Sequence, residues 1–111
     1  MESISKSLGT KFDDYVKPGQ VFIFSKSYCP YCDRAKQILK DLKVAFKAVE
    51  CDNVSVPKTV IDEVQKKSGV KTYPNIWVGN TSIGGCDNLK AALSNGKLYE
   101  LLDKEGIRYA A

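Results

Sequence analysis

Two cysteines separated by two residues follow closely on a short apolar run, and this arrangement restricts the fold more than any other feature. Residues 21–24, Val-Phe-Ile-Phe, are continuously apolar, which is typical of a strand covered on both faces. Residues 29–32, Cys-Pro-Tyr-Cys, open a segment reaching about Leu42 whose apolar residues recur at helical spacing. A Cys-x-x-Cys pair at a strand-to-helix junction indicates a thiol redox site.

The two cysteines of this pair have different expected environments. Cys29 lies where a helix N-cap is expected, and Pro30 suits the first helical position because its missing N–H has no helical partner there. The unpaired N–H groups of the first turn and the helix dipole favour a thiolate at Cys29, and Lys26 adds positive charge nearby. Cys32 faces the helix and is more shielded. We therefore expect Cys29 to attack and Cys32 to resolve.

Hydrophobic periodicity gives the order of the other elements, which are expected within one domain, residues 1–111. Strands are predicted at 46–50, 75–78 and 81–83, with a tight turn at Gly79-Asn80. Helices are predicted over 3–16, from Pro57 to Gly69, and from Asp87 to about Lys104, the last broken near Asn95-Gly96. The expected fold is α/β, a four-stranded mixed sheet with helices on both faces.

Composition removes several classes of function. The 111 residues include four cysteines and no histidine, so catalysis by Ser-His-Asp or Cys-His and zinc sites with histidine are excluded. Half of a zinc site is disfavoured because Cys51 and Cys86 form no second Cys-x-x-Cys. A structural disulfide within 29–32 closes too small a loop to stabilise the chain much. No metal ligand set is expected.

Charge and hydropathy bear on partners and compartment. The net charge of +4 gives a weak positive field, and Lys66, Lys67 and Lys71 are expected to be a solvated helix end because no aromatic residues interleave them. We expect no nucleic-acid partner. No apolar run is long enough to span a bilayer, and residues 1–6 lack the pattern of a secretory signal. The expected location is the reducing cytoplasm.

Three motifs in order resemble the dithiol glutaredoxins. They are Cys-Pro-Tyr-Cys preceded by Lys26, Thr72-Tyr73-Pro74 in the place of the family's Thr-Val-Pro, and residues 84–88, Gly-Gly-Cys-Asp-Asn, matching its Gly-Gly-x-x-Asp segment. The resemblance covers roughly residues 10 to 105. It implies a thioredoxin-like fold that binds glutathione.

The resemblance also implies particular contacts. Lys26 would hold the glycine carboxylate of glutathione, and Tyr31 would line the groove. Pro74 would be cis, so that Tyr73, in a segment shared with Thr72, presents its backbone N–H and C=O to the tripeptide. The backbone of Cys86 and Asp87, at a helix start, would receive the γ-glutamyl carboxylate.

Three positions depart from the family pattern. Tyr73 stands for the usual valine and alters the groove wall. Asn88 stands for the usual aspartate, and Asp87 is the neighbouring substitute for its charge. Ile61 lies where the family often has a Gln or Arg, for which Lys58 or Lys71 are alternatives.

The leading hypothesis is a glutathione-dependent oxidoreductase that reduces protein–glutathione mixed disulfides and protein disulfides. Glutathione is then a co-substrate, no cofactor is tightly bound, electrons come from NADPH through glutathione reductase, and the chain is a monomer. A thioredoxin-type reductase is the alternative that Lys26 and Gly84-Gly85 disfavour. An iron–sulfur carrier is a third, and Pro30 weighs against it. Cys86 is expected as an apolar filler or a regulatory thiol, Cys51 as structural or incidental, and Trp77 as packing.

Overall fold

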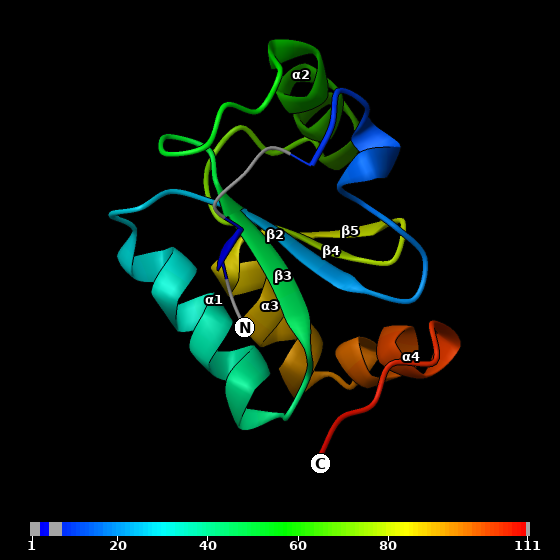
Figure 1. The fold of residues 1–111 in the computed structure, drawn as a ribbon. Helices are drawn as coiled ribbons and strands as arrows, with labels where there is room; N and C mark the ends of the chain where they lie inside the picture. Colours follow the sequence, from blue (N-terminus) through cyan, green and yellow to red (C-terminus); the bar gives the residue numbers. More distant parts are fainter. Residues whose placement is uncertain (1–2, 5–7, 111) are drawn as a thin grey trace.

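The computed structural model describes residues 3–4 and 8–110, which form a mixed β-sheet between two layers of helices (Figure 1). The elements, in chain order, are β1 (Ser3–Ile4), the 3-10 helix η1 (Phe12–Asp14), β2 (Val21–Ser25), α1 (Pro30–Asp41), β3 (Phe46–Glu50), α2 (Lys58–Ser68), β4 (Asn75–Val78), β5 (Thr81–Gly84), α3 (Cys86–Ser94) and α4 (Lys97–Lys104). The predicted strands and the helices after residue 29 are confirmed.

The sheet has the strand order β1-β3-β2-β4-β5. β3 is parallel to β1 and β2, whereas β4 is antiparallel to β2 and β5. The predicted four-stranded mixed sheet is confirmed, and the two-residue β1 adds a short fifth strand beside β3. Ser25 pairs with Glu50, so β2 and β3 end at the same edge of the sheet.

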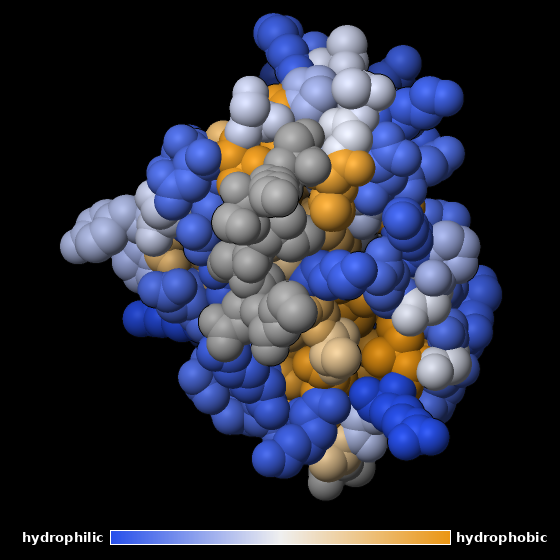
Figure 2. Space-filling view, viewed as in Figure 1, coloured by the Kyte–Doolittle hydropathy of each residue, from blue (hydrophilic) through white to orange (hydrophobic). Residues whose placement is uncertain are grey.

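Each face of the sheet carries its own apolar cluster. β2 alternates between them, since Val21 and Ile23 pack toward α1, α3 and α4, whereas Phe22 and Phe24 pack toward η1 and α2. Figure 1 shows α2 and η1 together on one side of the sheet. In Figure 2, hydrophilic side chains cover most of the outline of the molecule, and apolar residues are visible mainly toward the middle of this face. Burial on both faces explains the continuous apolar run of β2.

The helix predicted over residues 3–16 is wrong. Ser3 and Ile4 pair with β3, and among the described residues of this range only 12–14 are helical, in one 3-10 turn. The Asp14 carboxylate accepts the backbone N–H groups of Thr10 and Lys11, both at 3.1 Å, which favours a single turn over a longer helix. The apolar spacing instead reflects burial of Phe12 and Tyr15. Residues 5–7 of this prediction lie outside the described residues.

The helical stretch predicted from Asp87 to about Lys104 forms two separate helices, α3 and α4, with the break where it was predicted. The break is at Asn95-Gly96, where Gly96 has φ +82°. Trp77 is confirmed as a packing residue, with its ring 5.2 Å from that of Phe12 in an edge-on arrangement. Within residues 3–4 and 8–110, no helix has the length and apolar character needed to cross a membrane.

Candidate active site

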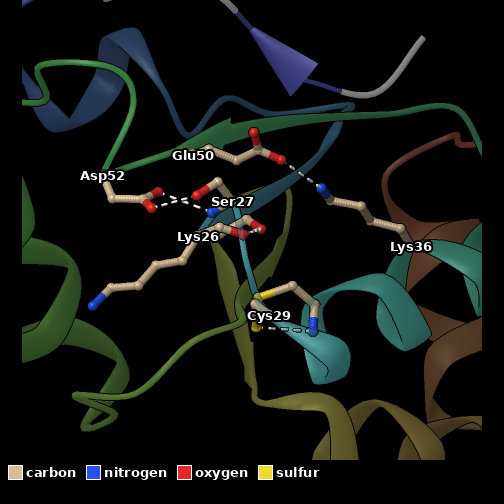
Figure 3. Close-up of polar contacts among 8 residues, drawn as sticks. Lys26, Ser27, Cys29, Lys36, Glu50 and Asp52 are labelled. Atoms are coloured by element: carbon tan, nitrogen blue, oxygen red, sulfur yellow. Dashed lines mark hydrogen bonds and ion pairs between the residues drawn. A yellow bond between two sulfur atoms is a disulfide. The ribbon is translucent and has the colours of Figure 1, made fainter.

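The two cysteines of the Cys-x-x-Cys pair lie between the end of β2 and the first turn of α1. In the structure Cys29 and Cys32 form a disulfide. Cys29 is the N-cap of α1, with Pro30 at the first helical position. The Cys29 sulfur accepts the Cys32 backbone N–H at 3.1 Å (Figure 3). The Cys29 carbonyl accepts the N–H of Asp33. A first-turn N–H directed at this sulfur stabilises negative charge on it. Cys32 is fully buried, so the predicted asymmetry of the pair is confirmed.

The loop before β4 lies directly against the dithiol. The Tyr73-Pro74 peptide bond is cis, as predicted. The Cys29 sulfur lies 3.9 Å from the carbonyl oxygen of Tyr73. Thr72 is exposed next to it. The backbone of residues 72–74 is therefore next to the reacting sulfur.

The Gly84-Gly85 segment lies on the other side of the cis-proline loop. A Cβ placed on Gly85 would lie 3.7 Å from the Pro74 carbonyl oxygen, so the start of α3 faces the cis-proline loop. Gly85 is the N-cap of α3, and Cys86 and Asp87 are its first residues. Cys86 packs in the core as the predicted apolar filler, whereas Asp87 is exposed.

Lys26 contacts the ring of Tyr73, and the residue after it is hydrogen-bonded to Asp52. The Lys26 ammonium lies 5.0 Å from the centre of the Tyr73 ring. In Figure 3 its side chain extends away from the disulfide. The next residue, Ser27, donates its backbone N–H and its hydroxyl to the carboxylate of Asp52, and these bonds lower the pKa of that carboxyl (Figure 3).

The remaining predicted residues lie at the rim. The Tyr31 side chain is 55% exposed in the first turn of α1, with the Arg34 guanidinium 5.4 Å from its ring centre. Both alternative cations are exposed. Lys58 is paired with Asp62 at 3.0 Å on α2, and Lys71 lies in the loop leading to Thr72.

Cys51 is closer to this site than its predicted structural role requires. It follows β3, and its backbone N–H donates to the Ser25 carbonyl at 2.8 Å. Burial raises the pKa of the Cys51 thiol, and the Tyr73 phenol lies close enough to its sulfur to influence that pKa. Parallel pairing of β2 and β3 brings Cys51 and Asp52 to the dithiol, because parallel strands end at the same edge. The thioredoxin-like fold implied by the resemblance is the signal that could have placed them there.

A buried ion pair supports the site from behind. Lys36, one helical turn after Cys32 on α1, bonds the carboxylate of Glu50 at 3.1 Å, and both side chains are largely buried (Figure 3). This pair joins α1 to the end of β3. Across the described part of the chain, no three Cys, Asp or Glu side chains converge in a way that could hold a metal ion.

Comparison with known sequences points to one family. A model of the family described as Glutaredoxin matches residues 21–83. The chain is 40% identical to glutaredoxin-C2 of Arabidopsis thaliana over 96 residues, which is 86% of each chain. It is 43% identical to a glutaredoxin of Pseudomonas aeruginosa over 82 residues, covering 74% of this chain and 94% of the relative.

Solved structures agree with this result. The holo form of glutaredoxin C1 from Populus tremula x tremuloides superimposes with a TM-score of 0.75 at 32% identity, covering 86% of each chain. A buckwheat glutaredoxin–glutathione complex gives a TM-score of 0.71 at 32% identity over 78% of each chain. The predicted thioredoxin-like fold is confirmed. With a dithiol at an N-cap, a cis-proline loop and a Gly-Gly helix start brought together, the chain belongs to the glutaredoxin family of thiol–disulfide oxidoreductases.

Proposed function

We propose that the chain is a glutathione-dependent thiol–disulfide oxidoreductase in which Cys29 is the nucleophile and Cys32 the resolving thiol. The observation that carries these roles is the position of the Cys29 sulfur. It accepts the Cys32 N–H at the start of α1 and lies 3.9 Å from the Tyr73 carbonyl, at the edge of the groove. Cys32 is fully buried, so an incoming disulfide meets Cys29 first.

The monothiol route uses Cys29 alone. Its thiolate attacks the glutathione sulfur of a protein–glutathione mixed disulfide, and the protein thiolate leaves and takes up a proton. A glutathione thiolate then attacks the glutathione sulfur bound to Cys29, which releases oxidised glutathione and restores the Cys29 thiolate.

The dithiol route uses both cysteines. The Cys29 thiolate attacks a client protein disulfide and forms a mixed disulfide. The Cys32 thiolate then attacks the Cys29 sulfur, which releases the reduced client and leaves the disulfide seen in the structure. Two glutathione molecules reduce this disulfide, and each step is an exchange between one thiolate and one disulfide.

Glutathione is proposed to lie along the groove between the cis-proline loop and α3. The Tyr73 backbone would pair with the cysteine part of the tripeptide, in the manner of an added strand. The free N–H groups at the start of α3, near Cys86 and Asp87, suit the γ-glutamyl carboxylate. Lys26 supplies a cation for the glycine carboxylate, and Tyr31 lines the rim. The buckwheat relative, whose solved structure is a complex with glutathione, supports glutathione as the ligand.

The proposal extends to the setting of the reaction. The chain would work as a monomer in the reducing cytoplasm, with glutathione as co-substrate and no tightly bound cofactor. Electrons would come from NADPH through glutathione reductase, and clients would be glutathionylated or disulfide-bonded proteins. Neither nucleic acid nor membrane is part of the proposed function.

A glutathione-coupled assay on a small glutathione mixed disulfide, compared with an assay on a protein disulfide, tests the roles. Cys29→Ser is expected to abolish both activities. Cys32→Ser is expected to keep deglutathionylation and lose protein-disulfide reduction, because only the second reaction needs a resolving thiol. Retained deglutathionylation in Cys29→Ser would overturn the assignment, as would recycling of the wild type by thioredoxin reductase but not by glutathione.

A further inference from the structure

The side chain of Tyr73 makes contacts that the proposed function does not use. That function needs only the backbone of this residue. Its ring, however, lies under the Lys26 ammonium, 5.0 Å from ring centre to nitrogen, and packs onto the apolar cluster of the η1 and α2 face. Its hydroxyl lies close enough to the Cys51 thiol for that thiol to raise the pKa of the phenol, after the larger effect of burial. One side chain thus joins the loops that follow β2 and β3 at the edge of the groove.

The contact with Lys26 restricts a side chain that would otherwise be free to move. Lys26 is exposed and has a long, flexible stem. A lysine loses much rotamer entropy when it is fixed by a ligand, and an aromatic face beneath the ammonium reduces that loss by holding the cation beforehand. Lys26 is also the cation proposed for the glycine carboxylate of glutathione.

Cys51 lies beside the same part of the sheet. Its backbone N–H bonds to the Ser25 carbonyl just after β3, which holds residue 51 against β2. Cys51 and the Tyr73 ring both pack against the apolar cluster of the η1 and α2 face, so packing restricts the ring. Burial raises the pKa of the Cys51 thiol, which makes this cysteine unsuited to attacking a disulfide.

We propose that Tyr73 is a positioning residue for glutathione selectivity: its ring holds the Lys26 ammonium where the glycine carboxylate of glutathione binds. The inference rests on the proposed function, because it presupposes glutathione in this groove. It assigns to the tyrosine that stands for the family's usual valine a role of its own.

The test compares glutathione with its glycine monoethyl ester, which lacks the one carboxylate in question. For the wild type we expect kcat/KM to favour glutathione by about two- to fivefold, the size of an exposed ion pair. Lys26→Met is expected to remove this preference. Tyr73→Val is expected to remove most of it, with the loss falling on KM for glutathione more than on kcat. Tyr73→Phe is expected to keep most of it because the aromatic face remains.

Two further measurements separate positioning from a general loss of structure. Tyr28→Val removes a tyrosine that is 95% exposed in the same loop as Lys26 and is expected to leave the preference unchanged. In nuclear magnetic resonance spectra, the Lys26 Hε signals should show a ring-current shift that Tyr73→Phe keeps and that Tyr73→Val and Tyr73→Leu abolish. The shift reports the stacking directly and does not depend on activity.

The outcomes distinguish the two levels of the account. A wild type that does not turn over glutathione contradicts the proposed function itself. If the wild type prefers glutathione and Tyr73→Val retains that preference, the inference on Tyr73 is overturned and the proposed function stands. Equal losses with glutathione and the ester, or a Lys26 signal without a ring-current shift, would likewise overturn the inference alone.

Discussion

Position relative to a helix start separates the two partly exposed thiols, Cys29 and Cys51. The sulfur of Cys29 accepts a first-turn N–H of α1, an arrangement that favours its thiolate. Cys51 ends a strand, and burial raises the pKa of its thiol. Only Cys29 therefore has both exposure and stabilisation of charge, which is why the account assigns the nucleophile to it.

Tyr73 gives a pH prediction at the same scale. Burial raises the pKa of its hydroxyl to about 12, and the neighbouring Cys51 thiol adds to the shift. A tyrosine in the unfolded chain titrates near pH ~10. Between these values the folded chain keeps a proton that the unfolded chain has lost, so the free energy of unfolding falls as the pH rises through this window.

The measurement is a spectrophotometric titration of tyrosinate in the wild type and in Tyr73→Phe. The difference between the two curves should be one phenol that titrates near 12, and Tyr73→Phe should lose less stability over the same alkaline range. A difference curve centred on the ordinary tyrosine value would show that the Tyr73 hydroxyl is solvated and would contradict its contact with Cys51.

Single residues also show how far the sequence predicts the site. The roles of Cys29 and Cys32 followed from helix-start chemistry, and the cis bond before Pro74 followed from the family motif. The contacts of Tyr73 with Lys26 and Cys51 did not. They join residues far apart in the chain and depend on side-chain directions, which a single sequence does not specify.

Among the elements, α1 depends on its buried ion pair with β3. The Lys36 ammonium bonds Glu50 at 3.1 Å with only 9% of the lysine side chain exposed. Lys36→Met keeps most of the apolar stem but removes the ammonium that pairs with the largely buried carboxylate of Glu50. We expect the free energy of unfolding to fall by about 1–3 kcal/mol, measured by urea denaturation with the dithiol kept oxidised.

Lys58→Met is the matched control, because Lys58 pairs with Asp62 on the surface of α2, where both side chains are exposed. An exposed pair of this kind contributes about 0.5 kcal/mol or less. Similar small losses in the two variants would mean that burial does not strengthen the Lys36–Glu50 pair, and the structural support assigned to it would be wrong.

The wrong helix over residues 3–16 shows the limit of periodicity at this scale. Its apolar residues are spaced as on a helix, and Phe12 and Tyr15 are indeed buried. The backbone nevertheless follows local hydrogen bonds of Asp14 and the pairing of residues 3–4 with β3. The longer periodic runs of α1 and α2 do form helices as predicted, and each places its regularly spaced apolar residues in the core.

Over the whole molecule, the sheet gathers every part of the site at one edge. β2 and β3 end side by side, and the chain then continues into the dithiol and into Cys51. The cis-proline loop and the start of α3 reach the dithiol from the β4 and β5 side. Strand order alone predicts which loops meet, whereas the depth and walls of the groove depend on packing in both layers.

The most direct test of the central claim is to locate the glutathione that the protein captures during the reaction. Cys32→Ser is treated with a glutathione mixed disulfide, and the adduct is mapped by mass spectrometry of the intact chain and its peptides. The account predicts one glutathione, on Cys29, and none in the Cys29→Ser/Cys32→Ser variant. An adduct on Cys51 or Cys86 instead of Cys29 would contradict the account.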